Sequence, residues 1–147
     1  MKPFCPGERS EFVKRLLAIV ALGAIALGPL ACSRSPEGGT PGTANSFVLV
    51  AGSVPSAIKQ GDAQSVKVTV ERGKDFHKSV RLQAKGPEKI HATLDRNLVK
   101  DNEPPDVNVR IHPNEDAAPG DYKVTVTAST DDGSPTNLEL AVRVVQK

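Results

Sequence analysis

The chain has 147 residues, enough for one domain of common size with short appendages. It contains 4 Phe, 1 Tyr and no Trp, so Val, Leu, Ile and Ala must build most of its core, and this composition favours a pleated sheet. Four basic and two acidic residues precede the first apolar run and account for the formal net charge of +2. The rest of the chain is balanced and lacks the basic stripe that binds phosphates, so nucleic acid is not an expected partner.

The N-terminus has the pattern of a signal peptide. Residues 1–15 are polar and basic, residues 16–31 carry no charge, and Pro29 lies near the end of the uncharged run. A membrane-spanning helix needs about 20 apolar residues, more than this run provides. We therefore expect residues 1–31 to be a cleaved signal peptide.

The sequence Leu30-Ala31-Cys32 resembles the end of a bacterial lipobox, in which a small residue precedes a cysteine that is diacylated and becomes the new N-terminus. The resemblance implies that Cys32 carries a lipid anchor with palmitate-like chains, and Ser33 after it favours the outer membrane, if the cell has one. Pro29 stands where a lipobox usually has Leu, which leaves ordinary secretory cleavage and an uncleaved anchor as alternatives. After processing Cys32 would be the only cysteine left, so no intramolecular disulfide is expected.

Residues 33–45 are rich in Gly, Pro, Ser and Thr and show no apolar period. Such a composition predicts a flexible tether, with an r.m.s. reach of roughly 20 Å. We therefore expect residues 32–45 to form the lipidated cysteine and its tether, and residues 46–147 to form the folded domain.

From Phe47 onward, short segments alternate apolar and polar side chains and are separated by turn residues. The most regular segment follows Pro119-Gly120, where Tyr122, Val124, Val126 and Ala128 share one face. Seven segments of this kind predict an all-β fold, an antiparallel sandwich of about seven strands. They are residues 47–51, 66–70, 80–85, 90–94, 107–111, 122–129 and 138–144.

The sequence Lys59-Gln60-Gly61-Asp62 before the second segment and Pro119-Gly120-Asp121-Tyr122 at the sixth resemble bacterial extracytoplasmic immunoglobulin-like domains. The resemblance implies an immunoglobulin-like β-sandwich, with Tyr122 as a structural tyrosine corner whose hydroxyl bonds upstream backbone. Val124 then holds the place of the second cysteine of antibody domains, so the domain resembles the disulfide-free branch. Such modules serve as spacers, adhesin repeats and accessory domains, so the resemblance implies no single function.

Candidate sites for metals and catalysis are weak. The strand pattern places His91 and His112 on outward positions and His77 in a turn, so we expect surface histidines and no metal site. The acidic groups in residues 101–103 and 131–133 could offer oxygen ligands to Ca²⁺, but turn chemistry explains them. No nucleophile elbow, thiol pair or phosphate loop is present, so we expect no catalytic residues and no cofactor.

The sequence thus predicts a non-catalytic, lipid-anchored protein of the cell or outer membrane that faces the periplasm or exterior. Its partners would be the membrane, through the anchor, and an unidentified envelope protein. The alternatives are a carbohydrate-binding accessory module with a glycan partner, and a small envelope hydrolase. The outward polar residues include Lys67, Thr69, Arg81, Gln83, Lys85, Lys123, Thr125 and Thr127, none of which the pattern marks as a binding site.

Overall fold

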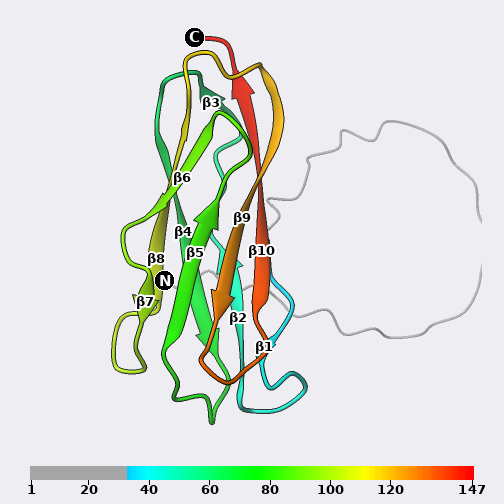
Figure 1. Ribbon diagram of the computed structural model, residues 1–147, viewed down its shortest axis with the longest axis vertical. Coiled ribbons are helices and arrows are strands. Elements are labelled where there is room, and N and C mark those ends of the chain that lie inside the picture. Colours follow the sequence, from blue (N-terminus) through cyan, green and yellow to red (C-terminus); the bar gives the residue numbers. More distant parts are fainter. Residues whose placement is uncertain (1–32) are drawn as a thin grey trace, which may run out of the picture. The chain divides into compact units, whose positions relative to one another are not determined.

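The computed structural model of the protein describes residues 33–147, so Cys32 and the predicted signal peptide lie outside the described residues. The described chain forms two five-stranded sheets that face each other (Figure 1). Every paired strand is antiparallel to its neighbour except β3, which runs parallel to β10. The all-β prediction is therefore confirmed.

The two sheets are named A and B here. Sheet A contains, in order, β1 (Gly38–Gly39), β2 (Ser46–Ala51), β4 (Gln64–Arg72), β8 (Asp106–Pro113) and β6 (Ile90–Leu94). Sheet B contains, in order, β3 (Ile58–Lys59), β10 (Thr136–Val145), β9 (Gly120–Ser129), β5 (Val80–Lys85) and β7 (Leu98–Val99).

Each of the seven predicted segments is a strand, but the described chain contains ten strands and not seven. The additional strands, β1, β3 and β7, have two residues each. Two residues are too few to show an alternating pattern, which is why these strands were missed. The stretch from Asp95 to Pro105, which lies between the fourth and fifth predicted segments, contains β7 and the fully buried Val99.

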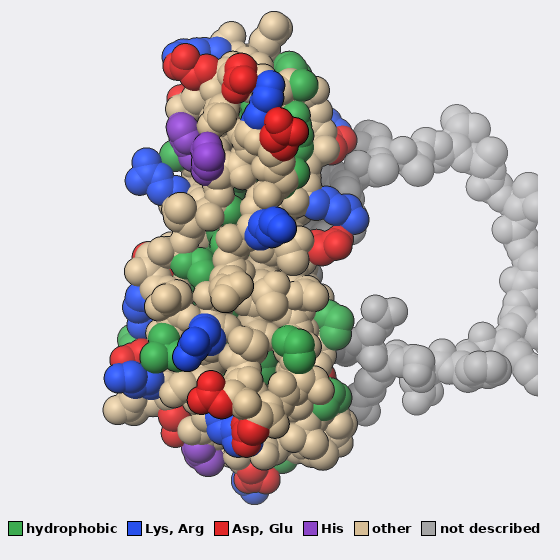
Figure 2. Space-filling model, in the orientation of Figure 1, with side chains coloured by type: hydrophobic (Ala, Val, Ile, Leu, Met, Phe, Trp, Pro, Cys, Tyr) green, Lys and Arg blue, Asp and Glu red, His purple; other side chains and the backbone are tan. Residues whose placement is uncertain are grey.

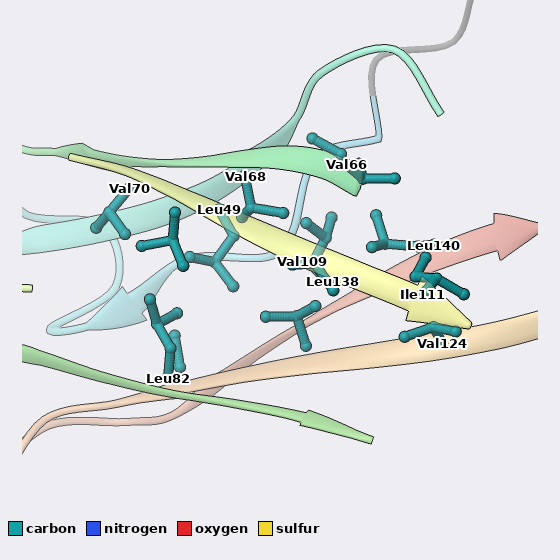
Figure 3. Close-up of a cluster of buried hydrophobic side chains, with 14 of the residues drawn as sticks. Leu49, Val66, Val68, Val70, Leu82, Val109, Ile111, Val124, Leu138 and Leu140 are labelled. Carbon is teal, nitrogen blue, oxygen red and sulfur yellow. The ribbon is translucent and has the colours of Figure 1, made fainter. Parts of the chain in front are cut away.

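The core lies between the two sheets and is built by the alternation of each strand. Figure 3 shows side chains of sheet A, among them Leu49, Val68 and Val109, lying against Leu82 and Leu138 of sheet B. The rings of Phe47 and Phe76 pack against each other with centroids 5.1 Å apart. Each fully buried Val, Leu or Phe contributes about 1.5–3 kcal/mol relative to its exposed state, so these aliphatic side chains supply most of the stabilisation.

The first half of the predicted tether is bonded to the edge of sheet A, where Gly38–Gly39 form β1 and Arg34 makes an isolated bridge with Val50. The amide of Ala51 donates to the carbonyl of Ser33 (2.8 Å), and the amide of Ser35 donates to the carbonyl of Leu49 (2.9 Å). Gly38 and Gly39 then pair with β2 as strand β1. We call residues 33–39 the strap, since they run along the outer edge of β2.

The strap is also fastened to sheet B. The hydroxyl of Thr136 donates to the carbonyl of Pro36 (2.7 Å), and Gly39 exchanges backbone hydrogen bonds with Ser134. Its glycines serve close packing, because a Cβ on Gly38 would lie 2.6 Å from the ring of Phe47. A composition typical of flexible linkers thus forms an ordered edge whose bonds come mainly from the backbone.

Two predicted turns carry the family resemblance, and the structure has a turn at only one of these two positions. The predicted turn at Lys59 to Asp62 is confirmed: the amide of Asp62 donates to the carbonyl of Lys59 (3.1 Å), and Gly61 has a φ of +77°. The other tight turn lies earlier than predicted, where the amide of Ala117 donates to the carbonyl of Asn114 (3.1 Å). Strand β9 already begins at Gly120.

Candidate functional surface

Six of the eight outward polar residues named above gather on one surface. Strands β10, β9 and β5 are adjacent in sheet B, and their outward side chains form what we call the B face. The remaining two, Lys67 and Thr69, lie on sheet A, where both contact the carboxylate of Asp106 at 3.8 and 2.7 Å. The members of the B face from the predicted set are Arg81, Gln83, Lys85, Lys123, Thr125 and Thr127.

The register of sheet B arranges the B face in rows. Thr127 lies between Gln83 of β5 and Asn137 of β10, and its hydroxyl donates to the amide oxygen of Asn137 (2.7 Å). In the next row Thr125 lies between Lys85 and Glu139. The centre of the face therefore carries short, half-buried threonines, with longer uncharged side chains on either side of Thr127 and longer charged ones on either side of Thr125.

The charges on the B face are partly neutralised. The ammonium of Lys123 lies 2.8 Å from the carboxylate of Glu139, and this hydrogen bond, together with the charge of Glu139, raises the pKa of Lys123. Figure 2 shows positive and negative side chains scattered over the visible face and no large hydrophobic area. Leu98 of β7 is the one large hydrophobic residue among those described that is exposed, at 37%.

The two best-formed hollows of the described chain are small. One, of about 260 Å³, lies between the loop after β2 and the edge of β10; the other, of about 210 Å³, is lined by Arg81, Asn97 and Leu98. Pockets for small molecules commonly hold about 300–1,000 Å³. An ion pair between Arg143 and Asp121 (2.7 Å) lines the first hollow, and the hydrogen bond from Arg143 lowers the pKa of Asp121.

Two of the three histidines meet, although the strand pattern alone gave no sign of a contact between them. His91 of β6 lies directly opposite His112 of β8, and their rings stack with centroids 6.5 Å apart. The Nε2 of His112 lies 3.1 Å from the carbonyl of Gly61, and His77 pairs instead with Asp101 (3.0 Å). Within residues 33–147 no three His, Cys, Asp or Glu side chains are grouped as metal ligands.

The acidic turn residues considered as Ca²⁺ ligands bond to other residues of the same chain. Asp132 accepts a hydrogen bond from the ammonium of Lys78 (2.7 Å), which lowers the pKa of Asp132. Asp101 faces His77, and Glu103 accepts from the backbone amide of Lys100 (3.2 Å). These contacts explain the acidic residues as parts of turns and surface ion pairs.

Tyr122 has the hydrogen bond that the tyrosine-corner resemblance implies. Its hydroxyl donates to the carbonyl of Ala118 (2.7 Å), while its ring is half-buried against the core. The bond is exposed and not buried. This bond links the start of β9 to the loop before it, and Cys32, the other predicted site residue, lies outside the described residues.

Arg72 was missed by the sequence analysis. Its guanidinium Nη2 donates to the carbonyls of Val99 and Lys100, both at 3.0 Å, and so links the end of β4 in sheet A to β7 in sheet B. Partial burial lowers the pKa of Arg72, although the charge of Asp101 opposes the shift. A signal was present, because Arg72 continues the inward phase of Val66, Val68 and Val70.

No protein-family profile and no curated protein sequence matches the chain. Several solved structures are similar to the chain, among them the following two, both at low identity. Domains 4 and 5 of the S-layer protein SbsC match with a TM-score of 0.46 and 17% identity, over 66% of this chain and 50% of that one. An endo-fucoidan hydrolase from glycoside hydrolase family 107 matches with a TM-score of 0.43 and 13% identity, over 63% of this chain and 13% of that one. The chain spans half or less of each of these proteins.

In the part of the chain that the structure describes, no helix has the length and apolar character needed to cross a membrane.

Proposed function

We propose that this protein is exported, is anchored by lipid on Cys32, and binds a protein partner at the cell envelope through the B face. The observation that carries this proposal is the B face itself, where Thr127 lies between the uncharged Gln83 and Asn137 and Thr125 lies between the charged Lys85 and Glu139. A surface of this kind suits contact with another protein surface more than enclosure of a small substrate.

The strand order supports an immunoglobulin-like sandwich. In that fold, strands A, B, E and D form one sheet, and strands C, F and G form the other. If the seven longer strands are lettered in chain order, β2, β4, β8 and β6 are adjacent as A, B, E and D. Likewise, β5, β9 and β10 are adjacent as C, F and G, and Tyr122 lies near the start of strand F.

The alternatives have less support. The space between the sheets is filled by buried side chains, and the best-formed hollows are small, so an enzymatic role has no evident substrate pocket in the described chain. A glycan-binding module usually presents an aromatic platform. The described aromatic residues, Phe47, Phe76 and Tyr122, all pack into or against the core.

The anchor is tested by fractionation. Cys32→Ser should move the protein from the membrane fraction to a soluble or unprocessed form, because the three acyl chains implied by the lipobox resemblance bind firmly where a single chain binds marginally. Mass spectrometry of the mature N-terminus should find an acylated Cys32. A free and unmodified start elsewhere would contradict the anchor.

Glycan binding and hydrolysis, the two alternative functions, are tested on a form of the protein that lacks the lipid anchor. The chain from residue 32 with Cys32→Ser should bind nothing specifically on a glycan array and turn over no substrate in a panel of envelope hydrolase assays. Specific glycan binding would favour the accessory-module alternative. Turnover that is abolished by one point substitution would favour the hydrolase alternative.

A further inference from the structure

The strap leaves no free chain between Cys32 and the sheet. Ser33, the residue that follows Cys32, already accepts a hydrogen bond from the amide of Ala51 (2.8 Å). Arg34 forms a bridge with Val50, and the hydroxyl of Ser35 accepts from the amide of Leu49 (2.8 Å). The described chain is therefore bonded to the edge of sheet A from its first residue, so a group attached just before Ser33 is joined to the sheet with no flexible segment between them.

This attachment point lies on a long flank of the sandwich. In Figure 1, β1, β2 and β10 lie along one flank, whereas β6 and β7 lie along the opposite one. Strand β2 ends partway along the long axis, so Ser33, which pairs with its last residue, is not at either tip. The loop of residues 52–57, with exposed Ser53 and Ser56, continues directly from that point.

We propose that the lipid anchor holds the sandwich side-on, with the strap flank against the lipid headgroups and the β6–β7 flank directed away. The inference rests on the proposed lipidation of Cys32. A tether of thirteen flexible residues would let the domain rotate freely at roughly 20 Å from its anchor. The strap removes that freedom, because hydrogen bonds fix its path. It bonds to β2, and its Pro36 and Gly39 also bond to Thr136 and Ser134.

Charge does not set this orientation. Three cations near the attachment point are paired: Arg34 with Glu71 (3.3 Å), Arg143 with Asp121 (2.7 Å) and Lys67 with Asp106 (3.8 Å). An anionic membrane surface attracts clusters of several unpaired basic residues, and this flank presents no such cluster among the described residues. The side-on orientation should therefore be the same on neutral and on anionic vesicles and should not change with salt.

The test measures how close chosen side chains come to the membrane. Beyond Cys5 in the signal peptide, Cys32 is the only cysteine of the chain, and its sulfur would be blocked by lipid, so single cysteines can be labelled selectively. Fluorophores are placed at Ser53→Cys and Ser56→Cys on the strap flank and at Thr93→Cys on β6. The lipidated proteins are reconstituted in phosphatidylcholine vesicles that carry a quencher on the lipid headgroup.

Quenching should be several-fold stronger at positions 53 and 56 than at position 93. The matched control inserts twelve Gly and Ser residues between Cys32 and Ser33, which should largely abolish the difference while leaving membrane binding intact. Equal quenching at all three positions without the insert would overturn the side-on orientation. A protein that lacks acyl mass and does not float with vesicles would instead overturn the lipid anchor, so the two failures are distinguishable.

Discussion

Gly39 and Ser134 hydrogen-bond to each other in both directions: the amide of Gly39 donates to the carbonyl of Ser134 (2.8 Å), and the amide of Ser134 donates to the carbonyl of Gly39 (2.9 Å). Gly39 belongs to the strap at the edge of sheet A, and Ser134 lies in the hairpin between β9 and β10 of sheet B. This bridge joins the two sheets at one end of the strap. The strap is therefore part of the domain's stability as well as the link to Cys32.

Substitution of Gly39 should show how much the strap contributes. Gly39 and Gly42 both have a φ of +78°, but a Cβ on Gly39 would lie 2.9 Å from the carbonyl oxygen of Asn45, whereas a Cβ on Gly42 meets nothing within 4 Å. We expect Gly42→Ala to cost about 1–2 kcal/mol, the usual penalty of a left-handed backbone. Gly39→Ala should cost roughly 2–4 kcal/mol. Equal urea midpoints for the two variants would show that the strap is not packed as described.

Arg72 should matter more than a surface arginine. Arg72→Met removes two hydrogen bonds to backbone carbonyls, one in β7 and one directly after it, and leaves the oxygens of Val99 and Lys100 without that donor. Hydrogen bonds to charged groups are worth about 1.5–3 kcal/mol, so we expect a loss in that range. Arg81→Met, on the exposed side of β5, is the matched control and should change the unfolding free energy by under about 0.5 kcal/mol. Similar effects of the two substitutions would rule out a link between the sheets through Arg72.

Tyr122→Phe should have a smaller effect than a buried tyrosine corner would give. The substitution removes the hydroxyl that donates to Ala118 and keeps the ring against the core. Because the bond is exposed, we expect a loss of about 0.5–1 kcal/mol in the unfolding free energy. Chemical denaturation checks this prediction, with Tyr122→Ala as a control that also removes the ring and should cost more. No difference between the wild type and Tyr122→Phe would mean that the hydroxyl bond does not stabilise the turn.

Lowering the pH should weaken the contribution of Asp95 to the stability of the fold. Burial of this carboxylate acts to raise its pKa, but hydrogen bonds from the side chain and backbone of Asn108 (2.9 and 3.0 Å) outweigh burial and lower it. A depressed folded pKa gives stability that is present above the unfolded value of about 3.9 and is lost as the pH falls through the folded value.

The carboxylate is largely exposed, so the effect should stay below about 1 kcal/mol. Asp95→Asn does not titrate, and the difference in urea midpoint between wild type and variant should therefore shrink between about pH 6 and pH 2. A difference that stays constant over this range would contradict the assignment.

The longer strands could be predicted from the sequence because each buries one face. The run Val66, Val68 and Val70 and the run Tyr122 to Ala128 alternate so regularly that their inward faces follow from the period of a strand. The strap could not be predicted in this way. Gly38 and Gly39 have no side chains to show a period, and their pairing with β2 comes from backbone bonds and close packing on Phe47.

Contacts between strands that are far apart in the sequence could not be predicted either. The outward phase of His91 and His112 was predictable, but their meeting depends on β6 lying beside β8, and strand order is not encoded in the alternation of either strand. The B face shares this property. Its residues could be named one by one, yet only the order β10, β9 and β5 brings them to one surface.

Photo-crosslinking in the cell that makes the protein can show whether the B face binds a partner. A photoreactive amino acid at Thr127, in the centre of the B face, should capture one reproducible envelope protein from the anchored chain. The same group at Thr93 on β6 should capture that protein much less, and Cys32→Ser should reduce capture from Thr127. Equal capture from both positions, or no reproducible partner from Thr127 while the purified chain turns over an envelope substrate, would contradict a binding role for the B face.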